Sequence, residues 1–305
     1  METQFIEWLR SQVSRHPRVP LGIGDDAAVV DLPAGKQWVV TTDMLMDDVD
    51  FHVGQHEPAR IGRKSLAVNL SDLAAMGARP VACFVSVALP RQGGGELARA
   101  IYEGVFALAR QFDTAIGGGD TNSWDGKLVI NVTAVGEVET GKAWQRSGAR
   151  AGDQILVTGE FGGSILGKHF DFTPRVAEAI WLAENAQITA AIDVSDGLSL
   201  DLSRICQESG CGAVLDLNSI PIAVAAANQA DKLTPLEHAL GDGEDFELIL
   251  AVAADEAERL LTLQPLAVPL TRIGQFVAEP GLWSQMADGT RAPLAPRGYE
   301  HRLAP

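Results

Sequence analysis

Residues 64–80 read "KSLAVNLSDLAAMGARP" and combine an apolar repeat with regularly spaced polar residues. Across residues 59–76 apolar side chains recur at every third or fourth position, which predicts an amphipathic helix. Gly77 and Pro80 follow it, and a glycine and then a proline are typical just beyond a helix C-terminus. Asn69 and Asp72 are three residues apart, so they share a helix face, which we expect to be different from the apolar one. The apolar positions are Ile61, Leu66, Leu70, Leu73 and Ala74.

The rest of the first half reads as alternating strands and helices around this segment. "KQWVVTTDMLM" (36–46) predicts a buried strand that ends in polar residues, and "TAIGGGDT" (114–121) a short strand entering a glycine turn. Apolar periodicity predicts a further helix over 96–112 and strands over 81–90 and 127–138.

After a boundary near residues 137–144, the pattern begins again. "DQILVTG" (153–159) predicts a strand, "TAAIDVS" (189–195) a strand that leads into a helix over 198–210, and "GDGEDFELILAV" (241–252) a glycine loop that leads into a strand. A length of 305 residues fits two domains of about 150 residues each. The expected fold class is therefore α/β, of the α+β type, with two domains.

The composition excludes several classes of partner. The net charge is −16, from 40 acidic and 24 basic side chains, which disfavours nucleic acid and anionic membranes. No apolar run approaches the roughly 20 residues of a membrane span, and the first residues lack the pattern of a signal peptide. The three cysteines form no C-x-x-C pair. We therefore expect a cytoplasmic protein without a disulfide framework or structural zinc site.

Glycine clusters with aspartate in both halves. The segments are "LGIGDDAAVV" (21–30), "GGGD" (117–120), "DVSDG" (193–197) and "GDGED" (241–245). Any one of these acids, taken alone, is better explained by a turn, a helix cap or a solvated face. Repeated at strand ends in both halves, they indicate Mg²⁺ sites that share the metal with a polyphosphate. The candidate oxygen ligands are Asp26, Thr41, Thr42, Asp43, Asp72, Asp120, Asp193, Ser195 and Asp196.

"GGSILGKH" (162–169) is a near match to the phosphate-binding P-loop, and it follows a predicted strand. His169, however, occupies the position where a P-loop needs Ser or Thr to bind Mg²⁺. The segment is therefore interpreted as the glycine-rich start of a helix.

Taken in order, eight segments resemble the thiamine-monophosphate kinase family, in the superfamily of aminoimidazole ribonucleotide synthetase and selenophosphate synthetase. They extend over nearly the whole chain. They read "GIGDDAAV", "TTDML", "KSLAVNLSDLAAMGARP", "GGDT", "RSGARAGDQILVTG", "AIDVSDGLSLDL", "GDGEDFEL" and "GYEH".

This resemblance implies two α/β domains in a homodimer. Residues 1–138 would bind ATP and Mg²⁺ and contribute strands to a dimeric barrel, and residues 139–305 would complete the nucleotide and substrate sites. ATP would lie in a cleft shared with the partner subunit. The implied reaction is direct, in-line transfer of a phosphoryl group from ATP to thiamine monophosphate on several Mg²⁺ ions.

The resemblance also implies a role for particular residues. Its metal ligands would be Asp26, Thr41 or Thr42, Asp43, Asp72, Asp120, Asp193 and Asp196, and its ATP contacts Tyr102, Gly119, Asp120, Arg146 and Ser195. Asp43, Asp72, Asp120 and Arg146 would be the catalytic group. Glu244 and Tyr299 would contact the substrate, as would Asp50, although the family usually has a His there. His52 lies two residues further on.

Other functions stay open. Selenophosphate synthetase has a reactive Cys or selenocysteine near its N-terminus, whereas the first cysteine here, Cys83, lies in a predicted strand. The hydrogenase-maturation relative ends in a reactive cysteine, whereas this chain ends "HRLAP". A reaction like that of aminoimidazole ribonucleotide synthetase, or non-catalytic binding of a nucleotide or divalent cation, are the remaining alternatives.

Overall fold

The structure, a computed structural model, describes residues 2–23, 28–286 and 288–300. The chain divides into two compact units. Unit 1 comprises residues 1–73 and 78–143, and unit 2 comprises residues 74–77 and 144–305. The functional roles assigned to residues 1–138 and 139–305 stay predictions. No helix in the described ranges is both long and apolar enough to cross a bilayer.

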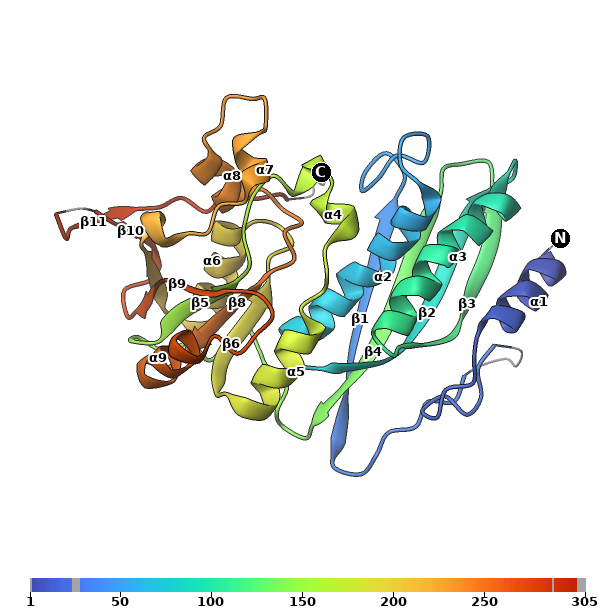
Figure 1. The fold of residues 1–305 in the computed structure, drawn as a ribbon, viewed down its shortest axis with the longest axis horizontal. Coiled ribbons are helices and arrows are strands. Elements are labelled where there is room, and N and C mark those ends of the chain that lie inside the picture. The colour runs from blue at the N-terminus through green and yellow to red at the C-terminus, as the bar shows by residue number, and fades with distance from the viewer. Residues whose placement is uncertain (1, 24–27, 287, 301–305) are drawn as a thin grey trace. The chain divides into compact units, whose positions relative to one another are not determined.

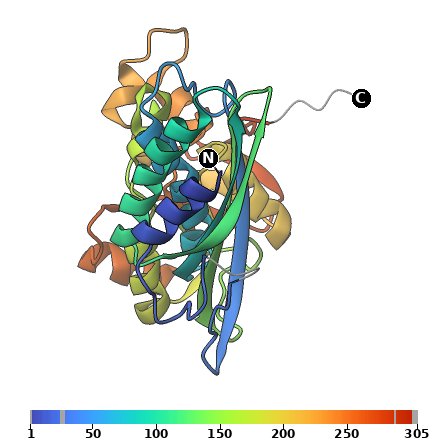
Figure 2. The ribbon, with the colours of Figure 1, turned by 90° about the vertical axis from the view of Figure 1, so that its right-hand side faces the viewer.

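Unit 1 is a four-stranded sheet with helices on one face (Figures 1 and 2). The strand order is β1-β4-β2-β3, in which only β2 and β3 are parallel. Helices α2 and α3 cover the sheet, and the sequence predicted both. The elements of unit 1 are α1 (Glu2–Gln12), β1 (Lys36–Met46), α2 (Pro58–Ala75), β2 (Arg79–Pro90), α3 (Gly94–Gln111), β3 (Ala115–Trp124) and β4 (Val129–Glu139).

Two glycines let α2 and α3 come into backbone contact. A Cβ atom on Gly104 would lie 1.7 Å from the carbonyl oxygen of Ala59, and one on Gly62 would lie 1.9 Å from that of Ile101. No side chain fits at either place. The position of α2 over the sheet, and so of the polar residues it carries, depends on this close crossing.

On the other face of the unit 1 sheet, the described residues form no helix, and this changes the interpretation of β1. Thr41, Asp43 and Leu45 point toward the helices, whereas Val40 and Met44 on the other face are 62% and 60% exposed. The expectation of a buried strand was therefore wrong. β1 lies at the edge of the sheet and is covered on one face only.

β3 is longer than the sequence predicted. It continues through "GGGD" to Trp124, so Asp120 lies within a strand and not in a turn. The glycines serve close packing here, because a Cβ on Gly119 would lie 1.8 Å from the carbonyl oxygen of Val85 in the neighbouring strand.

Unit 2 contains a mixed seven-stranded sheet in the order β11-β10-β7-β9-β5-β8-β6. Its strands are β5 (Gln154–Thr158), β6 (Ile188–Asp193), β7 (Gly212–Leu215), β8 (Leu248–Val252), β9 (Leu270–Val277), β10 (Gly281–Gln285) and β11 (Arg291–Pro293). The helical segments are η1 (Ser164–Leu166), α4 (Lys168–Asp171), α5 (Val176–Asn185), α6 (Leu198–Ser209), η2 (Leu217–Ser219), α7 (Val224–Ala227), α8 (Pro235–Gly241) and α9 (Ala254–Leu263).

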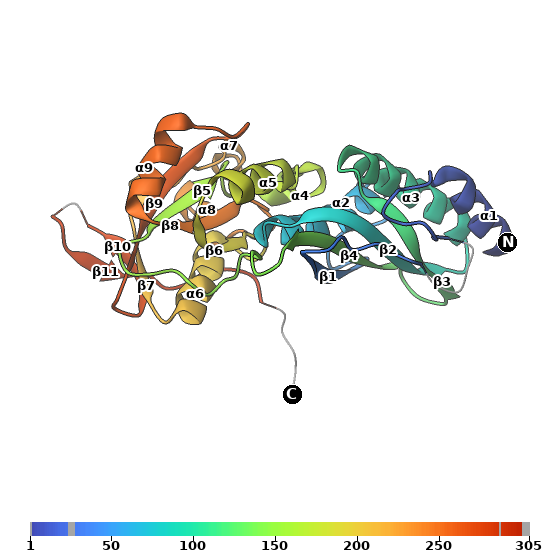
Figure 3. The same ribbon diagram turned by 90° about the horizontal axis from the view of Figure 1, so that it is seen from below.

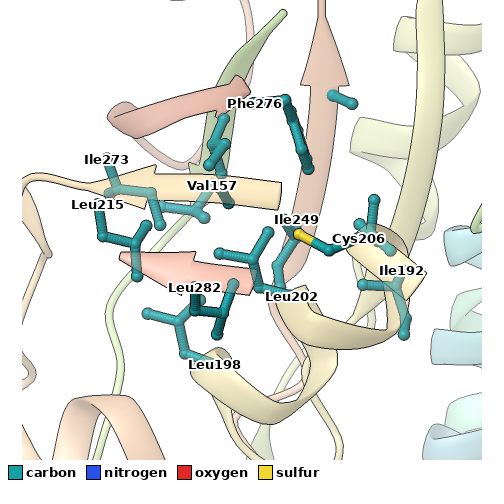
Figure 4. Packing of buried hydrophobic residues seen from close by; sticks show 14 of the residues in the cluster. Val157, Ile192, Leu198, Leu202, Cys206, Leu215, Ile249, Ile273, Phe276 and Leu282 are labelled. Carbon is teal, nitrogen blue, oxygen red and sulfur yellow. The ribbon is translucent and has the colours of Figure 1, made fainter. Parts of the chain in front are cut away.

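Helices α6 and α9 lie on opposite faces of this sheet (Figure 3). The apolar face of α6 packs on the strands to form the main core of the unit (Figure 4). Because α6 is held in this way, the turn before it, which carries "DVSDG", has a fixed place at the end of β6. The labelled core residues are Val157, Ile192, Leu198, Leu202, Cys206, Leu215, Ile249, Ile273, Phe276 and Leu282.

The helix crossing in unit 1 gives a stability test. Gly→Ala usually stabilises a helix by about 1 kcal/mol, but at Gly104 the added methyl group would force α3 away from α2. We expect Gly104→Ala to lower the free energy of unfolding by about 2 kcal/mol, measured by chemical denaturation. Gly95→Ala is the matched control, since Gly95 lies in the same helix with open space around it. Equal effects of the two substitutions would contradict this account of the crossing.

Candidate functional site

Strand β1 and helix α2 bring three of the predicted metal ligands together in unit 1. The hydroxyl group of Thr41 donates a hydrogen bond to the carboxylate of Asp72. Asp43 lies two residues beyond Thr41 on the same face of the strand. One helix and one strand therefore supply two carboxylates and a hydroxyl group to a single half-buried place.

The chemistry of this group fits a divalent cation. Burial, together with the neighbouring carboxylates of Asp72 and Asp50, raises the pKa of the Asp43 carboxyl to about 7. The side-chain oxygen of Asn69, one turn before Asp72, is buried and accepts no hydrogen bond from the described residues. Crowded carboxylates and an unused amide oxygen are the hard oxygen donors that Mg²⁺ prefers.

Two of these residues differ from the sequence expectation. Asn69 shares a helix face with Asp72 as expected, but it is fully buried, which the sequence did not indicate. Lys64 was not among the sequence candidates, although it is also fully buried, and its ammonium group donates a hydrogen bond to the carbonyl oxygen of Asp50 at 2.9 Å. A lysine inside an otherwise apolar repeat was the available signal, because burying a charge needs a partner.

Asp50 closes the turn after β1. Its carboxylate accepts a hydrogen bond from the backbone N–H of Met46 at 2.7 Å. His52, the alternative for the missing family histidine, is half exposed, and its Nδ1 lies 3.1 Å from the carboxylate of Asp48. A substrate contact at either residue stays a prediction.

Other predicted ligands of unit 1 lie elsewhere. Thr42 points to the open face of the sheet, where its hydroxyl group lies 3.0 Å from that of Thr133. Asp120 pairs with Ser86, whose side chain alternates with the buried Val85 and Val87, so Asp120 also belongs to the open face. Thr41 and Thr42 are therefore on opposite faces.

Asp26, a predicted metal ligand, lies outside the described residues.

Tyr102, a predicted ATP contact, lies in an aromatic cluster between α1 and α3. Its ring is 5.6 Å from that of Phe5 and 6.5 Å from that of Trp8, and its hydroxyl group donates to the carbonyl oxygen of Val85 at 3.4 Å. Tyr102 is 3% exposed, so contact with ATP would require these side chains to move.

In unit 2, the turn between β6 and α6 carries Asp193, Ser195 and Asp196. Asp201, which the sequence interpretation missed, holds this turn from within α6. Its carboxylate accepts hydrogen bonds from the backbone N–H groups of Asp196 and Gly197 at 2.9 and 3.1 Å. Its place in the first turn of a predicted helix, where carboxylates often bind free N–H groups, was the available signal.

The glycine loop before β8 lies against this turn. The backbone N–H of Glu244 donates to the carbonyl oxygen of Ser195 at 2.7 Å, and the N–H of Tyr299 donates to that of Asp196 at 2.9 Å. The structure thus places both predicted substrate residues of unit 2 beside predicted ATP and metal residues. Glu244 and Phe246 have φ angles of 62° and 51°, a left-handed conformation that costs energy for such residues and often marks functional sites.

Arg146 stands apart from this cluster. Its carbonyl oxygen accepts a hydrogen bond from Ser209 at 3.1 Å, at the end of α6 that is opposite to the turn. The Arg146 side chain is exposed.

Buried charges hold the glycine loop in place. Glu247, 1% exposed, accepts two hydrogen bonds of 2.6 Å from the guanidinium group of Arg175 and one of 2.8 Å from Thr158. Asp245 is fully buried beside Lys168, with 3.7 Å between the charged atoms, and it accepts hydrogen bonds from the N–H of Gly162. Burial is the main cause that raises the pKa of Asp245, to about 7.

The raised pKa of Asp245 predicts a pH dependence. Between pH 4 and 7 the folded chain keeps a proton at Asp245 that the unfolded chain has lost, so this residue contributes less stability as the pH rises. Asn cannot ionise. The free energy of unfolding of Asp245→Asn, relative to the unsubstituted chain, should therefore rise from pH 5 to pH 8 in chemical denaturation. Glu103→Gln, at an exposed carboxylate in α3, should show no such trend. If Asp245→Asn and the unsubstituted chain differ in free energy of unfolding by the same amount at pH 5 and at pH 8, the prediction is wrong.

Comparison with known families places the chain. The AIR synthase related protein, N-terminal domain, matches residues 24–138, and the corresponding C-terminal domain matches residues 147–285. Thiamine-monophosphate kinase of Rhodopirellula baltica is 44% identical, and the alignment covers 99% of this chain and 97% of the relative. The enzyme of the same name from Bacillus subtilis is 35% identical, and the alignment covers 98% of this chain and 99% of the relative.

Solved structures agree. The crystal structure of thiamine-monophosphate kinase from Stenotrophomonas maltophilia K279a has a TM-score of 0.82 at 37% identity, covering 94% of this chain and 96% of that one. The structure "AaThiL complexed with AMPPCP and TMP" has a TM-score of 0.77 at 26% identity, and the match covers 98% of this chain and 95% of that one. The chain therefore belongs to the AIR synthase related proteins and, within them, to the thiamine-monophosphate kinase family.

Proposed function

We propose that this chain is a thiamine-phosphate kinase, which transfers a phosphoryl group from ATP to thiamine monophosphate and forms thiamine diphosphate and ADP. Full-length similarity to thiamine-monophosphate kinases supports the activity. The structural observation that carries it is the 2.7 Å hydrogen bond between Glu244 and Ser195. It joins the loop assigned to the substrate to the turn assigned to the nucleotide.

The side chains of unit 2 suit the two substrates. Thiamine is a cationic, aromatic molecule, and the carboxylate of Glu244 and the exposed ring of Tyr299 offer a charge and an aromatic face to it. The acceptor is already a phosphate, so no general base is needed to activate it near neutral pH. What the protein must supply is alignment of two polyanions for in-line transfer. The predicted contribution of positive charge from Arg146 would have to come from the far end of α6, away from this turn.

We assign Mg²⁺ binding to the oxygen ligands of both units. In unit 1, Thr41, Asp43 and Asp72 would hold the metal, supported by their proximity and by the crowding of carboxylates around Asp43. Bound there, Mg²⁺ would offset the negative charge of the phosphates. Further ligands in this proposal are Asp26, Asp120, Asp193 and Asp196, and further ATP contacts are Tyr102, Gly119, Asp120 and Ser195. Thr42, the alternative to Thr41, is left out because its hydroxyl group lies on the opposite face of the sheet.

We also propose that the chain forms a homodimer through the open face of the unit 1 sheet. That face exposes Val40 and Met44 beside the polar residues Thr42 and Asp120. A second copy placed there would bury the apolar side chains and complete the dimeric barrel. The predicted cytoplasmic location is supported by three free, buried cysteines.

The products distinguish this proposal from the alternatives. The full chain with Mg²⁺, ATP and thiamine monophosphate should form ADP and thiamine diphosphate in equal amounts. Phosphorus NMR of the reaction mixture measures both products. A chelator should abolish the reaction, since the acidic site without metal repels both polyanions. Unphosphorylated thiamine should be a poor acceptor because it lacks the phosphate that receives the transferred group.

Other product patterns would overturn the proposal. Free phosphate with ADP would indicate a reaction like that of aminoimidazole ribonucleotide synthetase, and AMP one like that of selenophosphate synthetase. Nucleotide binding without turnover would indicate a non-catalytic protein.

A further inference from the structure

The P-loop-like stretch at residues 162–169 is bound to the loop at residues 242–247 by hydrogen bonds and ion pairs. The backbone N–H of Gly162 donates to the carboxylate of Asp245 at 2.9 Å, and the N–H of Gly163 donates to that of Asp242 at 2.8 Å. These are the kind of amide groups that a P-loop offers to phosphate. In this chain its own carboxylates occupy them, which explains why the stretch is not a nucleotide loop.

The two basic side chains of the stretch also point to that loop. The ammonium group of Lys168 lies 3.2 Å from the carboxylate of Glu247. Nδ1 of His169 lies 2.9 Å from Oε2 of Glu244. His169 is 4% exposed, and its ring packs against Phe170 with 4.1 Å between the ring centres. The imidazole is therefore held in one place, with a nitrogen directed at a carboxylate assigned to the substrate.

The main chain and the side chain of Glu244 are fixed separately. Its backbone is held in the left-handed conformation by the hydrogen bond to Ser195. Its side chain is 32% exposed, and its Oε2 contacts His169. An ionised carboxylate can only accept hydrogen bonds, so Nδ1 of His169 must carry the proton in this contact.

We propose that His169 is a positioning residue for substrate: it orients the carboxylate of Glu244 toward the positively charged ring of thiamine monophosphate. This inference rests on the proposed function. A carboxylate that is already oriented loses less freedom on binding, so the contribution of His169 is to substrate affinity. It does not touch the reacting phosphates, so the rate of phosphoryl transfer should be unaffected.

The test compares side chains that keep or remove the donor at the place of Nδ1. His169→Leu fills the space without a donor, and His169→Asn retains one, because the amide nitrogen of Asn stands where Nδ1 stands in His. We expect His169→Leu to raise the KM for thiamine monophosphate about tenfold, with kcat and the KM for ATP within about twofold. His169→Asn should restore most of the loss. Calorimetric titration with thiamine monophosphate should show the same order of affinities without turnover.

A double-substitution cycle checks that His169 acts through Glu244. In a Glu244→Gln background, His169→Leu should add less than about twofold to the KM for thiamine monophosphate. Independent, multiplicative effects would overturn the proposal, as would an equal loss of kcat and of affinity for both substrates. If neither His169→Leu nor His169→Asn folds, His169 is structural only and the proposal fails.

The activity of the unsubstituted chain shows whether a negative result counts against the proposed function or only against the role of His169. Failure of the unsubstituted chain to phosphorylate thiamine monophosphate would refute the proposed function. Normal activity of the unsubstituted chain, with an unchanged KM in His169→Leu, would refute only the role of His169.

Discussion

The structure depends above all on holding carboxylates close together and away from bulk water. A buried carboxylate is costly unless a cation or hydrogen-bond donors offset its charge. Unit 2 supplies these from its own chain, as Arg175 does for Glu247 and the amide of Gly162 does for Asp245. In unit 1, burial and then the carboxylates of Asp72 and Asp50 raise the pKa of Asp43, and a half-buried group of oxygen ligands of this kind suits a divalent cation.

This difference gives the two units different tasks in our account. In unit 2, ion pairs fix the left-handed loop that places Glu244 beside Ser195, so the proposed substrate site would be formed before the substrate binds. In unit 1, the close crossing of α2 over α3 places Asp72 beside β1, where oxygen ligands converge. A kinase whose acceptor is a phosphate needs both properties, an oriented substrate and neutralised charge, more than it needs a general base.

The sequence predicted most helices and strands because apolar periodicity is local, and the family because its motifs span the chain. It left Thr41 and Thr42 as alternatives, and only the position of α2 shows that Thr41 shares a face with Asp72. The contact of His169 with Glu244 joins segments that are far apart in the chain, so no spacing rule could find it. Burial of Asn69 was missed for the same reason, since it depends on which elements pack around α2.

If the carboxylates of unit 1 bind a divalent cation, removing one of them must lower the affinity for the metal. Mn²⁺ can stand in for Mg²⁺, and electron paramagnetic resonance counts the free ion during a titration of the full chain with a non-hydrolysable ATP analogue. We expect Asp72→Asn to weaken Mn²⁺ binding about tenfold or more without loss of the fold, because a charged ligand is removed. Asp113→Asn, at an exposed carboxylate in the same unit, should bind as the unsubstituted chain does. Unchanged Mn²⁺ affinity in Asp72→Asn would contradict the account.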